Sequence, residues 1–193
     1  LLTTNNQPQW YTVSGGSKNY VQKIIKSLGN KAVINDEVIG VWRNNAGSVL
    51  VKSKNNERIF DKVVFANHAD DALRLMQNAS ASEIEILSNF KYQKNLAILH
   101  RDSSVMPKSK KAWASWVYSN NSKKDNGQIS LSYWMNNLQN IDKNYPLFVT
   151  LNPNSKIDLH KIFASFNYDH PIFDAATVAA QERIDEIQGV DRF

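Results

Sequence analysis

The 193-residue sequence contains no cysteine, which excludes disulfide bonds, thiolate metal sites and cysteine nucleophiles. It also lacks an apolar run long enough to cross a bilayer, and its first residues are mostly polar. We therefore expect neither a signal peptide nor a transmembrane helix. A chain without cysteine fits a reducing compartment, and we predict that the protein is cytoplasmic.

Glycine is scarce, with 7 residues in the chain, and this limits the nucleotide sites that the sequence can form. A dinucleotide-binding enzyme needs a glycine-rich turn between a strand and a helix, because the helix N-terminus takes the pyrophosphate. The only glycine pair, Gly15-Gly16, follows a short extended segment and has no βαβ unit around it. We interpret it as a turn that leads into a helix. The sequence also has no Walker loop and no G-x-S-x-G elbow.

The 4 histidines do not stand at a spacing typical of metal ligands, so we predict no metal site. His68 follows an expected buried strand and precedes a helix, where ligand-facing loops lie in α/β folds. His100 ends an apolar strand. For both residues the alternative is a structural histidine whose ring is held by hydrogen bonds.

Hydrophobic residues make up 42% of the chain and charged residues 21%, which is typical of a globular protein. The net charge is +5, partly because of two lysine runs at residues 108–111 and 123–124. These runs are either solvated loops or a docking surface for anionic lipid or nucleic acid.

Hydrophobic spacing predicts an α+β fold in two regions, residues 1–68 and 69–193. The first region is expected to hold a helix that ends at Gly29, a three-stranded meander and a further buried strand. The second is expected to hold a mixed sheet flanked by helices, with a capping box at Ser80 and Glu83. The expected helices are 17–28, 70–77, 80–88 and 174–188, and the expected strands are 31–34, 38–43, 48–53, 57–60, 62–66, 96–100, 112–118, 128–135, 147–151 and 161–168.

Three tryptophans, Trp113, Trp116 and Trp134, fall in neighbouring strands of the second region. Because side chains alternate along a strand, Trp116 should share a face with Tyr118, and Trp113 should face the other way. Both faces of this sheet are therefore expected to be covered. The aromatic group is either core packing or the lining of a pocket that suits an apolar or amine substrate beside a flat cofactor.

The order of several short motifs resembles the flavin-containing amine oxidase superfamily, in a bacterial branch of predicted NAD/FAD-binding proteins. The run Trp10-Tyr11-Thr12-Val13-Ser14-Gly15-Gly16 is one such motif. Each motif is weak alone, but together they cover nearly the whole chain in one order. The matching stretches are 8–21, 60–70, 92–95, 99–102, 106–107, 113–116, 133–136, 149–153, 170–171 and 188–189.

The resemblance implies that the chain, which starts at Leu1, is an internal piece of an FAD-dependent oxidoreductase. Residues 1–68 would be a remnant of the FAD-binding domain with its meander, and 69–193 would be the substrate-binding domain. The glycine-rich fingerprint and a second flavin motif would lie outside the piece, so we do not expect it to retain FAD. Its partners would be the remainder of its own polypeptide and a small-molecule substrate.

The resemblance also implies roles for particular residues. Val38, with Val41 beside it, would contact the adenine through its backbone, and His68 is a second candidate on the cofactor side. His100 stands where many members place a lysine that holds a water near the flavin, which leaves amine oxidation itself open. Trp113, Trp116 and Trp134 would line the substrate side.

Three functions stay open at this point. The parent enzyme would take hydride from a C–N or C–C bond of an apolar or amine substrate. Alternatively, the chain is a basic aromatic binding module for a lipid surface or single-stranded nucleic acid. We expect no nucleic acid partner, because the lysines lie in loops and the tryptophans in apolar strands, and we keep peripheral membrane contact open. Alone, the piece is expected to be inactive and to self-associate through exposed apolar surface.

Overall fold

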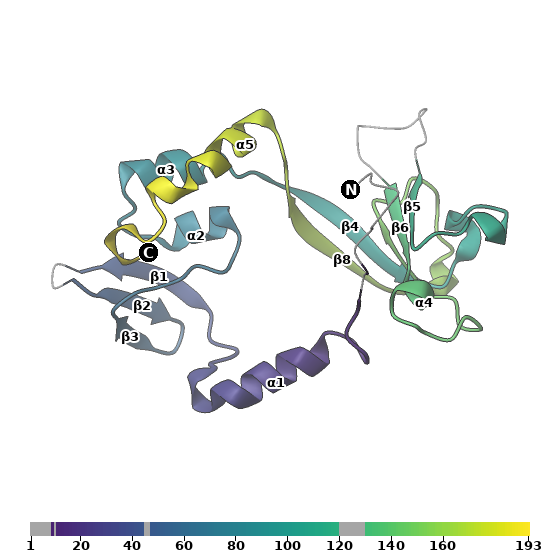
Figure 1. Cartoon of the computed structure of the whole chain (residues 1–193), viewed down its shortest axis with the longest axis horizontal. Coiled ribbons are helices and arrows are strands. Elements are labelled where there is room, and N and C mark those ends of the chain that lie inside the picture. The colour runs from purple at the N-terminus through teal and green to yellow at the C-terminus, as the bar shows by residue number, and fades with distance from the viewer. Residues whose placement is uncertain (1–8, 10, 45–46, 120–129) are drawn as a thin grey trace. The chain divides into compact units, whose positions relative to one another are not determined.

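A computed structural model describes residues 9, 11–44, 47–119 and 130–193 (Figure 1). The chain divides into two compact units: unit 1 is Leu1–Ala32 with Lys94–Tyr168, and unit 2 is Val33–Gln93 with Asp169–Phe193. Among the described residues, no helix is both long enough and apolar enough to span a membrane. The expected lysine pair at 123–124 and the start of the strand expected at 128 lie outside the described residues.

Unit 2 contains the predicted meander. Its strands β1 (Val38–Arg43), β2 (Val49–Ser53) and β3 (Glu57–Phe60) pair in the order β1-β2-β3, and both pairs are antiparallel. Val41, Val49 and Leu75 form a buried cluster, in which strand alternation turns Val41 and Val49 to one face and helix α2 (Ala69–Leu75) supplies Leu75. Val38, Val51, Val63, Phe65 and Phe193 pack around them.

Three short helices accompany this sheet: α2 (Ala69–Leu75), α3 (Ala81–Leu87) and α5 (Ala175–Glu182). Figure 1 shows α2 beside β1, and α2 contacts both β1 and α3. The predicted capping box is confirmed, since the Ser80 hydroxyl accepts from the Glu83 amide and the Glu83 carboxylate accepts from the Ser80 amide. Helix α5 is shorter than expected, because a 3-10 turn, Ile184–Glu186, replaces its last part.

Unit 1 holds helix α1 (Lys18–Leu28) and a five-stranded sheet of order β5-β6-β7-β4-β8. Gly29 ends α1 at a positive φ of 56°, as the pattern predicted, but the Ser17 side chain makes no capping bond. A short helix, α4 (Met135–Leu138), follows β6 and was not expected. The strands are β4 (Tyr92–His100), β5 (Trp116–Ser119), β6 (Ser130–Trp134), β7 (Phe148–Leu151) and β8 (Ile162–Pro171).

Strand register assigns the side chains of this sheet to two faces, because directly opposed residues of antiparallel strands lie on the same side. Trp134 and His100 both oppose Phe148, and Ser132 opposes Thr150. We name this side the His100 face. Trp116 opposes Tyr133, which opposes Val149, and we name this side the Trp116 face.

The α+β class, with sheets flanked by helices, is confirmed. Two expected strands are wrong: residues 31–34 follow a 3-10 turn without pairing, and residues 62–66 are extended but lie in no strand. In the second stretch Val63 still donates its amide to the Arg192 carbonyl at 3.0 Å. The predicted boundary at residue 68 divides the chain by function, into a cofactor domain and a substrate domain, whereas the two units divide it by compactness. The functional boundary stays a prediction.

Candidate functional site

His100 lies at the end of β4 and is completely buried, at 0% exposure. Its Nδ1 accepts a hydrogen bond from the Asp102 amide at 3.1 Å, and its Nε2 lies 2.8 Å from the Thr150 hydroxyl. Since Nδ1 is an acceptor, a neutral ring must carry its proton on Nε2 and donate it to Thr150. Both ring nitrogens are therefore engaged within unit 1.

A chain of hydroxyl groups continues from this histidine across the sheet. The Thr150 Oγ1 lies 2.8 Å from the Ser132 Oγ, and both side chains are buried. Because Thr150 accepts from His100, its own proton is available for Ser132. The chain ends at a polar cavity of about 280 Å³. Hydroxyl and amide groups dominate its lining, which includes Ser104, Ser119, Ser130, Ser132, Thr150 and Asn154.

Burial lowers the pKa of His100 below its ordinary value of 6.5, because a charged imidazolium would lose its hydration there. The nearby Asp102 carboxylate opposes this shift without reversing it. The ring is therefore neutral at pH 7, which agrees with the hydrogen bonds that it makes. A fixed cation, such as the lysine that the resemblance places at this position, would have no room for hydration here.

Asp102, two residues after His100, joins two segments of unit 1, its own loop and the turn at 158–161. Its carboxylate accepts from the amides of Ser104 at 3.1 Å and Asp158 at 3.0 Å, and from the Lys161 ammonium at 3.1 Å. Burial would raise the pKa of Asp102, but these bonds outweigh burial and hold the pKa far below its usual range. The buried charge is thus compensated, and it fixes the loops that cover the His100 face.

Trp113 and Trp134 pack together on the His100 face. Their rings meet edge to face at 5.2 Å, and Trp113 meets Phe148 in the same way at 5.8 Å. Phe148 in turn stacks on His100 at 5.6 Å. The Trp113 indole donates to the Pro107 carbonyl at 2.8 Å, which satisfies its polar atom in a partly buried position. This cluster is core packing, one of the two interpretations of the aromatic group.

Trp116 lies on the opposite face of the same sheet. It is 55% exposed, and its ring meets Tyr133 edge to face at 6.3 Å. The expectation that both faces are covered is therefore wrong for the Trp116 face. Its members are exposed or half-buried, apart from the buried Ala97: Trp116, Tyr118, Leu131, Tyr133, Val149, Leu151 and Leu99.

The two residues predicted on the cofactor side lie in unit 2. Val38 begins β1, an edge strand of the meander, where the register with β2 shifts between Val38 and Gly40. His68 is exposed before α2 and stacks on Tyr92 at 4.4 Å, and the Tyr92 hydroxyl accepts the Ala69 amide at 2.9 Å. Tyr92 therefore fixes the start of α2 and the position of the His68 ring.

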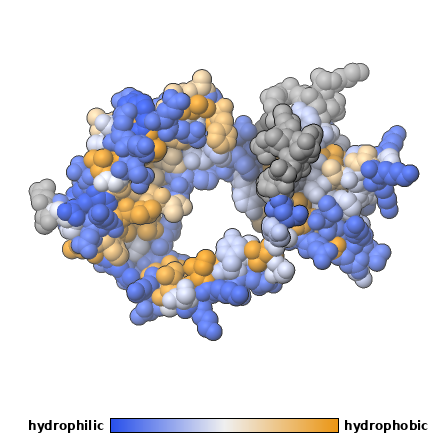
Figure 2. All heavy atoms as spheres, in the orientation of Figure 1, coloured by the Kyte–Doolittle hydropathy of each residue, from blue (hydrophilic) through white to orange (hydrophobic). Residues whose placement is uncertain are grey.

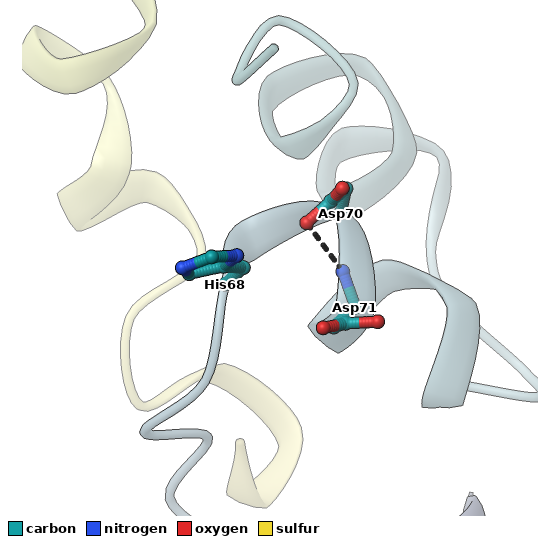
Figure 3. A group of neighbouring side chains, drawn as sticks. All are labelled: His68, Asp70 and Asp71. Atoms are coloured by element: carbon teal, nitrogen blue, oxygen red, sulfur yellow. Dashed lines mark hydrogen bonds between the residues drawn. The ribbon is translucent and has the colours of Figure 1, made fainter. Parts of the chain in front are cut away.

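His68 also lies close to two carboxylates of the same turn, Asp70 and Asp71 (Figure 3). One ligand atom from each residue lies within 4.8 Å of the others. However, Asp70 already accepts the Asp71 amide at 2.8 Å, and the side chains are exposed or half-buried. Exposed groups of this kind are common without a metal, so the turn alone does not make a metal site.

The structure thus brings together His100, Trp113 and Trp134 on one face and leaves Trp116 on the other. Sequence reasoning missed Thr150, Ser132 and Phe148, which complete the His100 face. Their signal was present, because serine alternates with apolar residues at the start of 130–134 and Thr150 is the one polar residue of 148–151. The roles predicted for the six residues are not tested by these positions and stay predictions.

No family model matches the chain, and no curated protein matches it. Among solved structures, the chain is similar to a CLA-producing fatty acid isomerase from P. acnes, with a TM-score of 0.62 and 14% sequence identity. The likeness covers 92% of this chain but 45% of that one, so this chain spans less than half the length of that protein. What the two share is the α+β fold.

Proposed function

We propose that this chain is the substrate-binding portion of an FAD-dependent oxidoreductase-like enzyme, and that its substrate is an apolar molecule with a long hydrocarbon chain. Two findings support the proposal. The ordered motifs resemble the flavin amine oxidases along nearly the whole chain, and the fold is similar to that of a CLA-producing fatty acid isomerase. The second finding favours an acyl substrate over an amine.

The observation that carries the proposal is the exposed apolar Trp116 face. Apolar side chains that cover one side of a sheet ordinarily face a core, because each buried CH₂ contributes about 0.8 kcal/mol. Here Trp116 and Tyr118 are instead exposed, beside a half-buried Tyr133 and half-buried aliphatic neighbours. Flat aromatic rings beside leucine and valine offer good contact to a hydrocarbon chain and exclude water from it.

The residues of this chain would form only part of an FAD-binding site. When bound, FAD supplies the redox chemistry. The adenine contact would come from the backbone of Val38, but the sequence contains no glycine-rich turn for the pyrophosphate. The residues present therefore do not hold the whole cofactor, and we derive no step through it. The contribution of this chain is to bind the substrate, orient it and keep water away.

In this proposal His100 has a structural role and does not contact the substrate. Its ring is buried between Phe148 and Thr150, so it holds the layer beneath the sheet in one arrangement. A substrate on the Trp116 face would lie across the sheet from it. The water that the resemblance implies at this position would have to lie on the buried side to reach His100.

The test is a titration of the purified chain with parinaric acid, a fluorescent polyunsaturated fatty acid. We expect saturable binding that Trp116→Ala weakens about tenfold, because a lost aromatic contact is worth about 1.4 kcal/mol. Tyr145→Ala is the matched control, since Tyr145 is an exposed aromatic residue of unit 1 outside the sheet. Equal losses in both variants, or tighter binding of benzylamine, would contradict an acyl substrate.

The flavin is tested on the full-length protein that contains this chain. We expect that protein to show bound-flavin absorbance, and the 193-residue chain with added FAD to show none after desalting. A full-length protein that is colourless and ignores FAD would exclude the cofactor while leaving the fatty acid titration interpretable.

A further inference from the structure

Helix α1 presents an apolar surface that the described residues of unit 1 leave exposed. None of its 11 residues is buried, although Tyr20, Val21, Ile24, Ile25 and Leu28 are large and hydrophobic. These five lie on one side, because residues three and four apart share a face of a helix. Figure 2 shows apolar side chains gathered along one side of α1 and hydrophilic ones along the other.

The other side of α1 is basic. Lys18, Lys23 and Lys26 lie on it, Lys31 follows the helix, and no acidic residue occurs before Asp36. At 3.6 residues per turn, Lys18 and Lys23 border the apolar side and Lys26 lies opposite it. Lys23 and Lys26 also line a groove of about 450 Å³ between α1 and the segment before it.

A helix of this length is not stable by itself. Isolated helices shorter than about 12–15 residues are marginal in water, and most helices in proteins are stabilised by packing an apolar face. Helix α1 obtains no such packing from the described residues of unit 1. It therefore needs a surface that accepts an apolar side and attracts positive charge.

We propose that α1 lies in the plane of an anionic lipid surface, with its apolar side, Val21 to Leu28, inserted among the acyl chains and with Lys18 and Lys23 against phosphate groups. Helices with one apolar face and a lysine-rich polar face bind bilayers in this way. The charge decides between occupants, because a neutral protein surface would gain nothing from lysines that border the apolar side. This inference goes beyond the proposed function and does not depend on it.

The experiment is flotation of the 193-residue chain with vesicles of phosphatidylcholine containing 30% phosphatidylglycerol, against vesicles of phosphatidylcholine alone. We expect binding to the anionic vesicles that 0.5 M salt reverses. Lys18→Glu with Lys23→Glu should weaken the binding by roughly tenfold or more, since each basic residue near the surface contributes about fivefold. Both lysines are exposed, so the variant should keep its fold.

A matched charge control is Lys110→Glu with Lys111→Glu, which changes the net charge equally at another exposed site. We expect it to bind nearly as well as the wild type. An equal loss in this control, or no loss in the α1 variant, would show that general charge attraction acts instead and would overturn the proposal.

The apolar side is tested by Ile24→Asn, with Ile84→Asn on α3 as the control. The two isoleucines are 52% and 50% exposed, so the substitutions remove similar exposed surface. Only Ile24→Asn should reduce flotation. The proposal is overturned if Ile24→Asn leaves flotation intact but converts an oligomer to a monomer in light scattering, because a second copy of the chain would then cover the helix.

Discussion

The Nε2 of His100 donates to the hydroxyl of Thr150 at 2.8 Å, and this bond joins two neighbouring strands beneath their aromatic side chains. The ring must be neutral for a second bond, in which its Nδ1 accepts from the Asp102 amide, because a charged imidazole has no acceptor nitrogen. A charged ring would have a proton on Nδ1 facing that amide. The stability of unit 1 should therefore respond to the protonation of this one histidine.

We predict that unit 1 loses stability as the pH falls below 6.5. The pKa of His100 is lowered by folding, so the unfolded state binds more protons below 6.5, and the free energy of unfolding decreases with falling pH. The loss continues until the pH reaches the folded pKa. Thermal unfolding between pH 8 and pH 5 would measure it, and His100→Gln should flatten the slope.

His100→Gln keeps a donor for Thr150 but does not titrate. If this variant does not fold, the ring protons of His100 in the wild type provide a second measurement by NMR. Their titration midpoint should lie below 6.5. A midpoint above that value would contradict the neutral buried ring.

Asp102 should act in a separate and more acidic window. The pKa of this carboxyl is depressed in the folded state, so its contribution is present above the ordinary value of 3.8 and is lost below it. Asp102→Asn should remove the part of the acid transition that lies below pH 4 and enlarge the change below pH 6.5, because the carboxylate no longer opposes the lowering of the His100 pKa. Loss of both transitions in this variant would show that the two groups titrate as one.

Unit 2 should depend on the ion pair between Arg43 and Glu83. The guanidinium contacts both carboxylate oxygens of Glu83, which is 3% exposed, and lies 3.6 Å from the centre of the Phe193 ring. Burial would raise the pKa of Glu83, but the bonds from Arg43 and the Ser80 amide hold it below its ordinary value. Arg43→Ala leaves a buried charge unpaired and should cost about 3–5 kcal/mol in urea unfolding.

Arg183→Ala is the matched control for that measurement. Arg183 pairs with Glu85 and Glu186, but its side chain is 41% exposed and both partners are more exposed still. Exposed pairs contribute about 0–1 kcal/mol, because water solvates the separated charges well. Similar losses in the two variants would mean that burial of Glu83 is not what makes the Arg43 pair important.

Local signals predicted much of this fold. The meander strands 38–43 and 57–60 have the predicted bounds, because turn residues such as asparagine and aspartate flank them on both sides. The capping box at Ser80 and the stop at Gly29 are likewise local chemistry. Residues 62–66 were wrong as a strand, because an apolar run gives strand propensity but cannot supply the neighbouring strand that it needs.

The candidate site was less accessible to sequence reasoning. Alternation alone placed Trp116 and Tyr118 on one face and Tyr133 and Trp134 on opposite faces, as the register confirms. It could not show that Thr150 of a distant segment accepts from His100, because that contact depends on the order of β4, β7 and β6 in the sheet. Alternation also could not show that the Trp116 face is exposed.

The two faces of the sheet should differ in the stability that is lost when a tryptophan is removed, and Trp113→Ala can be compared with Trp116→Ala to test this. Trp113 packs on Trp134 and Phe148 and donates to Pro107, so its removal leaves a cavity and should cost about 3 kcal/mol or more. Trp116 is 55% exposed, and its removal should cost about 1 kcal/mol, mainly the contact with Tyr133. Urea unfolding followed by circular dichroism measures both. A larger loss for Trp116→Ala would mean that this face is covered in solution, for example by another copy of the chain, and would remove the main support for a substrate there.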